Sequence, residues 1–147
     1  MQLQRFLPYR LAVLADAVSR ATAAVYRQRF QLSRDEWRLL AALGEAGRIQ
    51  AAEAAQITTL EKMQASRALR SLEARGLVSR ETDPDDRRHV IVHLLPPGRT
   101  LLRQITPVVL AREAWLLEGL SEEERAVLDR ALTRLLARAR ELPQDAA

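Results

Sequence analysis

The spacing of apolar side chains changes twice along the chain. From residue 9 to 30, apolar residues recur at alternating steps of three and four, which predicts a helix with one apolar stripe. The stripe consists of Leu11, Leu14, Val18, Ala21 and Val25. A helical period continues in shorter segments to about residue 75, gives way to short β-branched runs, and returns from residue 99 to the C-terminal end.

Polar residues mark where several of these helices begin. Three pairs of a hydroxyl residue and a glutamate have the spacing of a capping box, in which both side chains satisfy amides of the first helical turn. The pairs are Ser33–Glu36, Thr58–Glu61 and Ser121–Glu124. They predict helices that begin near residues 33, 60 and 121, and an Ala-rich stretch at 50–57 predicts a short helix in between.

Residues typical of β-strands are confined to one region of the chain. Residues 77–80 and 89–94 are compatible with strands, and the cluster 83–86 between them is rich in turn-forming residues, so the pattern predicts a hairpin closed by Pro96-Pro97-Gly98. A helix is expected over 99–118, with Pro107 as a kink or break.

Taken in order, these elements predict one domain over residues 1–147. The expected fold class is mainly α with a small β-hairpin wing: a winged helix-turn-helix core at about 33–97, with dimerisation helices at about 9–30 and 99–142.

Composition narrows the possible classes of protein. The chain has 147 residues, of which 48% are hydrophobic and 29% are charged, as in a globular protein. Without cysteine it can form no disulfide or thiolate site, and without a Gly-rich loop it is not a nucleotide-binding fold. No apolar run approaches the ~18 residues of a membrane span, and the N-terminus does not resemble a signal peptide, so we expect a cytoplasmic protein.

Positive charge is concentrated in the middle of the chain. Of 23 basic residues Lys62 is the only lysine, and the formal net charge is +4. Codon usage in a GC-rich genome would account for much of the preference for arginine, so its distribution is more informative. Residues 62–80 hold five cations against one acid, whereas residues 113–147 hold eight acids against five arginines. A basic centre is typical of a protein that binds nucleic acid.

The helix expected at 60–75 has two distinct faces. At about 100° per residue, Ala65, Ala68, Leu69 and Leu72 fall on one side. The opposite side shows Met63, Gln64, Ser66, Arg67 and Arg70, next to Lys62. These residue types suit a DNA major groove, because arginine binds guanine, glutamine binds adenine and an apolar group contacts the thymine methyl. A solvated amphipathic helix is the alternative interpretation.

The hairpin tip strengthens the DNA-binding hypothesis. Arg87 and Arg88 follow the turn, and arginines on a thin β-finger can enter a narrow minor groove. Asp86 is close enough in sequence to orient one of them. The alternative is an ordinary soluble hairpin tip of mixed charge.

Two stretches together resemble a known family. Residues 64–80, followed by Asp83-Pro84-Asp85-Asp86-Arg87-Arg88, are similar to the recognition helix and wing of MarR-type transcriptional regulators. The resemblance implies a homodimer with two winged lobes, usually a repressor released by a small ligand. It maps Gln64, Ser66, Arg67 and Arg70 to the groove-facing helix, and Asp86 and Arg88 to a wing pair.

The chain departs from the family pattern in one place. Leu95-Pro96-Pro97-Gly98 stands where members more often have Leu-Thr before the glycine, so a hydroxyl that could cap the next helix is missing. The lack of cysteine also excludes the peroxide-sensing branch of the family.

The terminal helices are candidates for dimerisation. Two lobes on a twofold axis would read DNA half-sites about 34 Å apart, on a pseudo-palindromic operator. The apolar residues available for this contact are Leu11, Leu14 and Val18 near the N-terminus, and Leu128, Leu132 and Leu135 near the C-terminus. The alternative is that these stripes pack only within one chain.

A small-molecule effector is expected by the same resemblance. Tyr9, Arg10 and Trp37 could hold an aromatic acid, or an acyl carboxylate or thioester, between two aromatic walls and a cation. The stretches Phe-Leu-Pro-Tyr-Arg and Asp35-Glu36-Trp37-Arg38 are also similar to members that respond to such ligands. The alternative is that these aromatics are ordinary core or interface residues, as we expect for Trp115.

No catalytic or metal-binding arrangement emerges. His89 and His93 stand too far apart on a strand to chelate together easily, and no carboxylate spacing completes a zinc triad. We therefore expect no cofactor and no enzyme. The sequence predicts a ligand-responsive DNA-binding regulator, and the competing hypothesis is a winged-helix adaptor that binds proteins instead of DNA.

Overall fold

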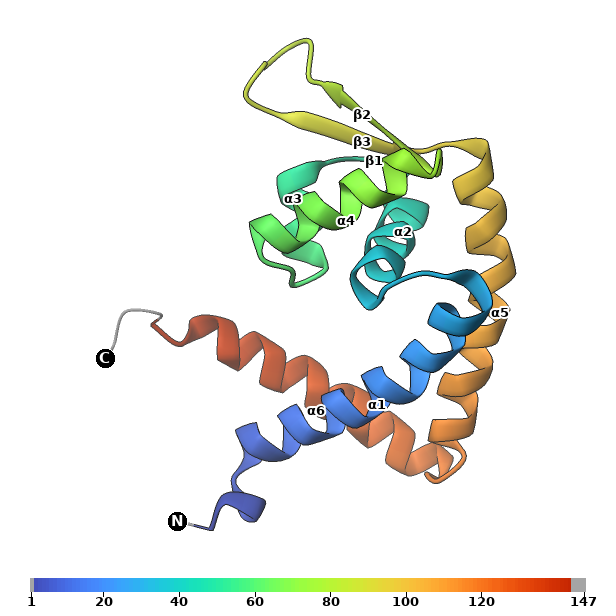
Figure 1. Cartoon of the computed structure of the whole chain (residues 1–147). Helices are drawn as coiled ribbons and strands as arrows, with labels where there is room; N and C mark the ends of the chain where they lie inside the picture. The colour runs from blue at the N-terminus through green and yellow to red at the C-terminus, as the bar shows by residue number, and fades with distance from the viewer. Residues whose placement is uncertain (1, 144–147) are drawn as a thin grey trace. The chain divides into compact units, whose positions relative to one another are not determined.

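The order of the elements follows the changes of period along the sequence (Figure 1). The computed structural model describes residues 2–143. The elements are the 3-10 helix η1 (Leu3–Arg5), α1 (Leu7–Phe30), α2 (Arg34–Ala46), β1 (Arg48–Gln50), α3 (Ala51–Ile57), α4 (Lys62–Ala74), β2 (Val78–Thr82), β3 (Val90–Leu94), α5 (Pro96–Leu117) and α6 (Glu122–Glu141). The chain divides into two compact units, one ending at Val109 and one beginning at Leu110.

Two of the three predicted capping boxes are confirmed. At α2 the Glu36 amide donates to Ser33 Oγ at 3.1 Å, and the Ser33 amide donates to Glu36 Oε2 at 2.9 Å. The Ser121–Glu124 pair makes the same two bonds at the start of α6, at 3.1 and 2.8 Å.

The predicted box at Thr58 is wrong. Thr58 ends α3, where its hydroxyl donates back to the Ala54 carbonyl at 2.6 Å. Helix α4 begins later, with Glu61 as N-cap, and the Glu61 amide donates to Gln64 Oε1 at 3.1 Å. A threonine hydroxyl can serve the end of one helix or the start of the next, and here the preceding helix uses it.

The hairpin is confirmed and is joined by a strand that the sequence did not predict. The sheet has the order β1-β3-β2 with both pairings antiparallel, and Val92 of β3 pairs with Ile49 of β1 and Arg80 of β2. β1 has only three residues, and Ile49 is its one β-branched side chain. Such a segment carries no local strand signal, so its extended state depends on pairing with β3.

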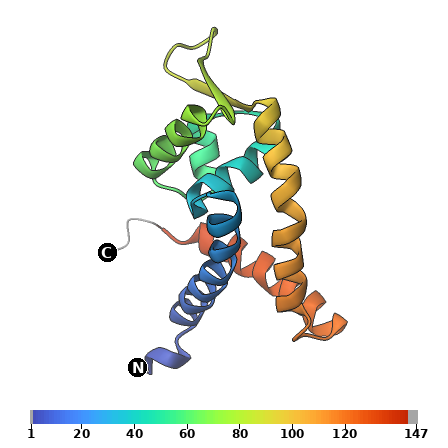
Figure 2. The same cartoon turned by 45° about the vertical axis from the view of Figure 1, so that its right-hand side comes forward.

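The core of the first unit lies between the helices and this sheet. Leu39, Leu40, Leu43, Leu72 and Val92 have no exposed area, and they come from α2, α4 and β3. Tyr26 of α1 and Ile105 of α5 extend the same cluster. With the core beneath it, the hairpin extends beyond the helices as a finger (Figure 2).

The base of the hairpin is held by a close backbone approach. The Leu95 amide donates to the Leu77 carbonyl at 3.0 Å, and a Cβ atom at Gly98 would collide with that carbonyl. Helix α5 already begins at Pro96, so the prolines and glycine belong to its first turn instead of preceding the helix as predicted. Pro107 does not break α5, which continues to Leu117.

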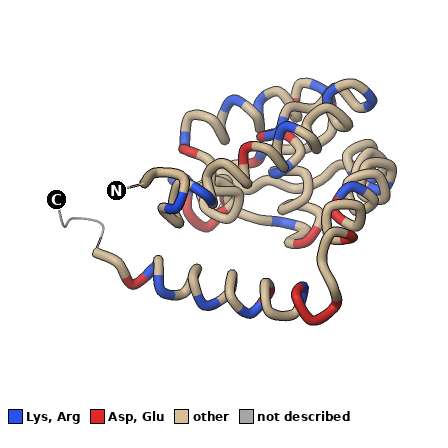
Figure 3. Tube along the Cα trace, turned by 90° about the horizontal axis from the view of Figure 1, so that it is seen from below, with Lys and Arg blue, Asp and Glu red and all other residues tan. Residues whose placement is uncertain are grey.

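The second unit contains the end of α5 and the whole of α6. Acidic residues occupy the first turn of α6, and basic residues follow along it (Figure 3). No residue of α6 is buried, and Val127 and Leu132 are about half exposed. In the described part of the chain, no helix has both the length and the apolar character that crossing a bilayer requires.

Candidate nucleic-acid interface

Helix α4 has the two faces that its sequence predicts. Ala65, Ala68, Leu69 and Leu72 are buried against the core. Lys62, Met63, Arg67 and Arg70 are exposed, and Gln64 and Ser66 are half-buried at the edges of this outer face. Because the inner face packs against the core, the exposed side chains of α4 point away from it.

Local contacts restrict some of the outer side chains. Arg70 Nη2 donates to Ser66 Oγ at 3.2 Å, one turn earlier on the helix. The Gln64 Oε1 atom already accepts from the Glu61 amide, which leaves the NH₂ group of Gln64 for other partners. The exposed face therefore offers cationic and amide donors above an ordered backbone.

The cations between residues 62 and 80 fall into two groups. Within residues 2–143, the structure gives no ion pair to Lys62, Arg67 or Arg70. Arg80, by contrast, donates through Nε and Nη2 to Glu73 Oε2 at 2.9 and 2.6 Å. Arg75 donates to the main-chain oxygens of Gln31 and Phe30 at 3.0 and 3.3 Å. The basic stretch inferred from the sequence is therefore only partly available to a ligand.

The wing holds a preorganised arginine. Arg88 Nε and Nη2 donate to the two carboxylate oxygens of Asp86 at 2.9 and 2.8 Å, and the Arg88 amide adds a third bond at 3.1 Å. These bonds lower the pKa of Asp86 to about 2 and raise that of Arg88. The expectation that Asp86 orients an arginine is confirmed for Arg88, whereas Arg87 is exposed without an ion pair among the described residues.

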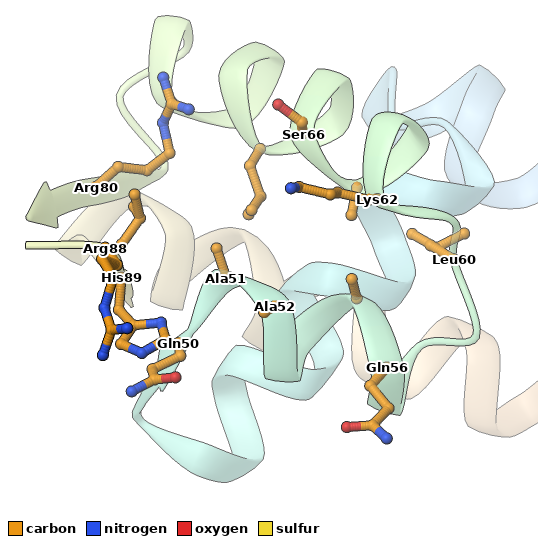
Figure 4. Close-up of a pocket in the computed structure, with 14 residues that line it drawn as sticks. Gln50, Ala51, Ala52, Gln56, Leu60, Lys62, Ser66, Arg80, Arg88 and His89 are labelled. Carbon is orange, nitrogen blue, oxygen red and sulfur yellow. The ribbon is translucent and has the colours of Figure 1, made fainter. Parts of the chain in front are cut away.

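A hollow of about 630 Å³ separates α4 from the wing (Figure 4). Lys62 and Ser66 of α4, Arg80 of β2, and Arg88 and His89 of the wing lie around it, over small residues of α3. His89 Nε2 lies 3.3 Å from Asp86 Oδ2.

Sequence reasoning missed three polar residues of this hollow. They are Gln50, Gln56 and His89. No motif marks them, because only the packing of α3 beneath the wing brings them near Lys62.

The three candidate ligand residues do not meet within the chain. Tyr9 and Arg10 line a shallow hollow of about 480 Å³ near the start of α1. Trp37 is half-buried and stacks on Tyr26, with ring centroids 6.2 Å apart and planes 24° apart. Burial raises the pKa of Tyr26. Tyr9 and Tyr26 are about 25 Å apart along α1, so Tyr9 and Trp37 do not line one pocket within this chain.

Two further observations concern side chains outside α4 and the wing. Trp115 is 70% exposed, so the expectation that it packs is not met within this chain. Among the described residues, no three His, Asp or Glu side chains are grouped as a metal ion would require.

Comparison with known proteins shows a likeness to one family. The sequence model of the MarR family matches residues 30–89, which include α2, α3, α4 and the start of the wing. Over this segment the chain is similar to the MarR family. A curated relative from Thauera aromatica, a putative transcriptional regulatory protein for the hcr operon, is 35% identical over 77 residues. That match covers 52% of this chain and 46% of the relative, so the chain spans about half the length of the relative that it matches.

Solved structures extend the likeness over nearly the whole chain. A MarR-family transcriptional regulator from Silicibacter pomeroyi is 27% identical, with a TM-score of 0.80 over 95% of this chain and 94% of its own. The structure of the S. aureus MepR–DNA complex is 23% identical, with a TM-score of 0.79 over 90% of this chain and 98% of MepR. At that identity the second comparison shows the fold alone.

Proposed function

We propose that this protein is a homodimeric, sequence-specific DNA-binding transcriptional regulator of the MarR family. The observation that carries the proposal is the outer face of α4, where Lys62, Arg67 and Arg70 are exposed and free of carboxylates among residues 2–143. A cationic face of this kind beside an arginine-bearing wing is complementary to the two grooves of a duplex. The shared fold of MepR, whose structure was solved as a DNA complex, supports the same docking.

The two parts of the surface have different tasks in this proposal. Helix α4 enters the major groove, where Arg67 and Arg70 bind guanine edges or phosphates and Met63 contacts a thymine methyl. The wing follows the backbone into the adjacent minor groove, and Arg88 arrives there already oriented by Asp86. A guanidinium held in this way loses less conformational freedom on binding than a free one.

Dimerisation is supported by the exposure of the terminal stripes. Leu11 and Leu14 on α1 are 40% and 56% exposed, and Leu128, Leu132 and Leu135 on α6 are 38 to 48% exposed. Apolar rows of this length are typical of surfaces that pair with a second copy, and an isologous pair would present two α4 helices to successive half-sites. Val18 is half-buried and contributes less.

The proposal also includes regulation of the protein by a small anion. Tyr9 and Arg10 offer an aromatic wall and a cation at an exposed hollow, which suits an aromatic acid or its thioester. Binding of that anion would release a repressor from its operator. Thermal-shift screening with benzoate-type acids and acyl thioesters tests this part, with Arg10→Ala as the variant that should lose the shift.

The direct test of DNA binding uses a duplex selected from a random-sequence pool by the wild-type protein. Arg67→Ala should weaken binding to this duplex at least about tenfold, as expected when a bidentate base contact is lost. Arg103→Ala is a matched control, because Arg103 is exposed on α5 and, among the described residues, its side chain has a hydrogen bond to Thr100 and no ion pair. Equal affinities of the two variants would contradict the proposal.

A salt series separates this function from the alternative of a protein-binding adaptor. A DNA-binding dimer should show a steep linear fall of log affinity with log salt concentration, since each phosphate contact releases counterions. An adaptor should show neither selection of a duplex nor such a slope.

A further inference from the structure

Helices α2 and α4 meet at the carboxylate of Glu36. This side chain is 8% exposed and lies in the first turn of α2. Its Oε2 atom accepts from the Ser33 amide at 2.9 Å, and its Oε1 atom accepts from the Ser71 hydroxyl of α4. The capping box that begins α2 therefore also binds the recognition helix, 35 residues further along the chain.

Arg75 completes this joint from the end of α4. Its Nη1 atom lies 3.7 Å from Glu36 Oε2 and donates to the Gln31 carbonyl at 3.0 Å. Its Nη2 atom donates to the Phe30 carbonyl at 3.3 Å. Both carbonyls are at the C-terminal end of α1, where a guanidinium satisfies unpaired oxygens and suits the helix dipole.

The joint lies on the same stripe of α4 as a proposed DNA contact. Arg67 and Ser71 are four residues apart and therefore neighbours on one side of α4, and Arg75 follows Ser71 by four residues as the C-cap of the helix. A rotation of α4 that moves Ser71 away from Glu36 would also turn Arg67. The apolar face of α4 holds the helix on the core, but alanines make up half of its four buried residues, and small side chains restrict rotation weakly.

We infer that Ser71 and Arg75 are positioning residues for DNA recognition: by tying α4 to Glu36 and to the end of α1, they set the direction in which Arg67 points. The inference rests on the proposed DNA-binding function. It also links α1, which carries an exposed apolar stripe, to the recognition helix through Arg75.

The test compares Ser71→Ala, Arg75→Ala, Arg75→Lys and the double alanine variant, with Arg103→Ala as a control of equal charge change. Each full-length protein is titrated with the duplex selected by the wild type, across a salt series. We expect Ser71→Ala and Arg75→Ala each to bind about tenfold more weakly, with the salt slope of the wild type. The double variant should lose less affinity than the sum of the two single losses, because both side chains contact the Glu36 carboxylate.

Arg75→Lys keeps the charge and part of the hydrogen bonding, so it should bind DNA more tightly than Arg75→Ala. It should also remain folded, which keeps the test valid if Arg75→Ala unfolds. Hydrogen exchange of the amides of residues 62–75 supplies a readout that does not involve DNA. Faster exchange in Arg75→Ala than in Arg103→Ala is expected if the joint holds α4 in place.

Three results would overturn the inference. One is unchanged affinity of both single variants. Another is a salt slope reduced by about one unit in Arg75→Ala while Ser71→Ala binds normally, because Arg75 would then contact a phosphate directly. The third is unchanged exchange in α4. If the wild-type protein selects or binds no duplex, the proposed function is overturned, and with it the role of the joint in DNA recognition. The exchange data would still report whether the joint holds α4 in place.

Discussion

The two ends of α4 carry the same type of residue in opposite circumstances. At the N-terminal end, Lys62 and Arg67 are exposed, and the structure gives them no carboxylate partner within residues 2–143. Just beyond the C-terminal end, Arg75 is bound to α1 and Glu36, and Arg80 is bound to Glu73. A count of cations treats all four alike, but only the first two are available to an anionic partner.

The difference arises from where the acids lie. Glu73 is on α4 itself, seven residues before Arg80, and the turn at Gly76 brings strand β2 back past it. Glu36 comes from a helix that is distant in sequence. The pairs beyond the C-terminal end therefore link α4 to α1, α2 and β2, whereas Lys62 and Arg67 have no carboxylate partner among the described residues.

The largest expected effect comes from reversing the charge of Arg67 and Arg70, the exposed arginines of α4. The double variant Arg67→Glu/Arg70→Glu should lose DNA binding by more than about a hundredfold, because it removes two contacts and adds repulsion from phosphates. Its free energy of unfolding should stay within about 0.5 kcal/mol of the wild type, as for exposed substitutions. A gel shift measures DNA binding, and urea unfolding measures stability. A large loss of stability would mean that these arginines hold the fold together, as Arg75 and Arg80 do.

For Arg80, which is paired with Glu73 beyond the C-terminal end of α4, we expect a loss of stability. Arg80→Ala should lower the free energy of unfolding by about 1–2 kcal/mol, since it removes a half-buried, doubly hydrogen-bonded ion pair. Urea denaturation measures this loss. Glu73→Ala should cost a similar amount, and the double variant should cost less than the sum; strict additivity would mean that the pair does not interact energetically.

A smaller effect is expected at the wing. Arg88→Ala should weaken DNA binding several-fold and reduce the slope of log affinity against log salt by about one unit, since one phosphate-facing cation is lost. The free energy of unfolding should change only slightly, because the Arg88 side chain is exposed and its pairing with Asp86 is screened by solvent. A salt series by fluorescence anisotropy measures the slope, and an unchanged slope would mean that the wing does not contact the duplex.

The smallest effect concerns the titration of Asp86. Its pKa of about 2 in the folded protein lies below the ordinary value of 3.8, because the Arg88 side chain hydrogen-bonds its charged form. The pairing therefore favours the folded wing above about pH 3.8, and this contribution is lost as the pH falls through about 2. Carboxyl ¹³C shifts should show the low midpoint in the wild type and a midpoint closer to 3.8 in Arg88→Ala; equal midpoints would remove Arg88 as the cause.

Local patterns predicted the faces of helix α4 and the wing well. The buried face of α4, the Asp86–Arg88 pair and the capping boxes at Ser33 and Ser121 all involve residues within a few positions of one another. Their geometry follows from helical period and turn chemistry, which act over short separations. Thr58 shows the limit of this reasoning, because two adjacent helices compete for one hydroxyl.

What the sequence by itself determined is therefore the α-helices, the hairpin and the outward face of α4, because hydrophobic period is a property of neighbouring residues. Tertiary structure alone decided which arginines are free, that Trp37 stacks on Tyr26 far from Tyr9, and that residues 48–50 form a strand. Each of these outcomes depends on a partner many residues away in the sequence, and periodicity carries no information about such partners until the core has packed.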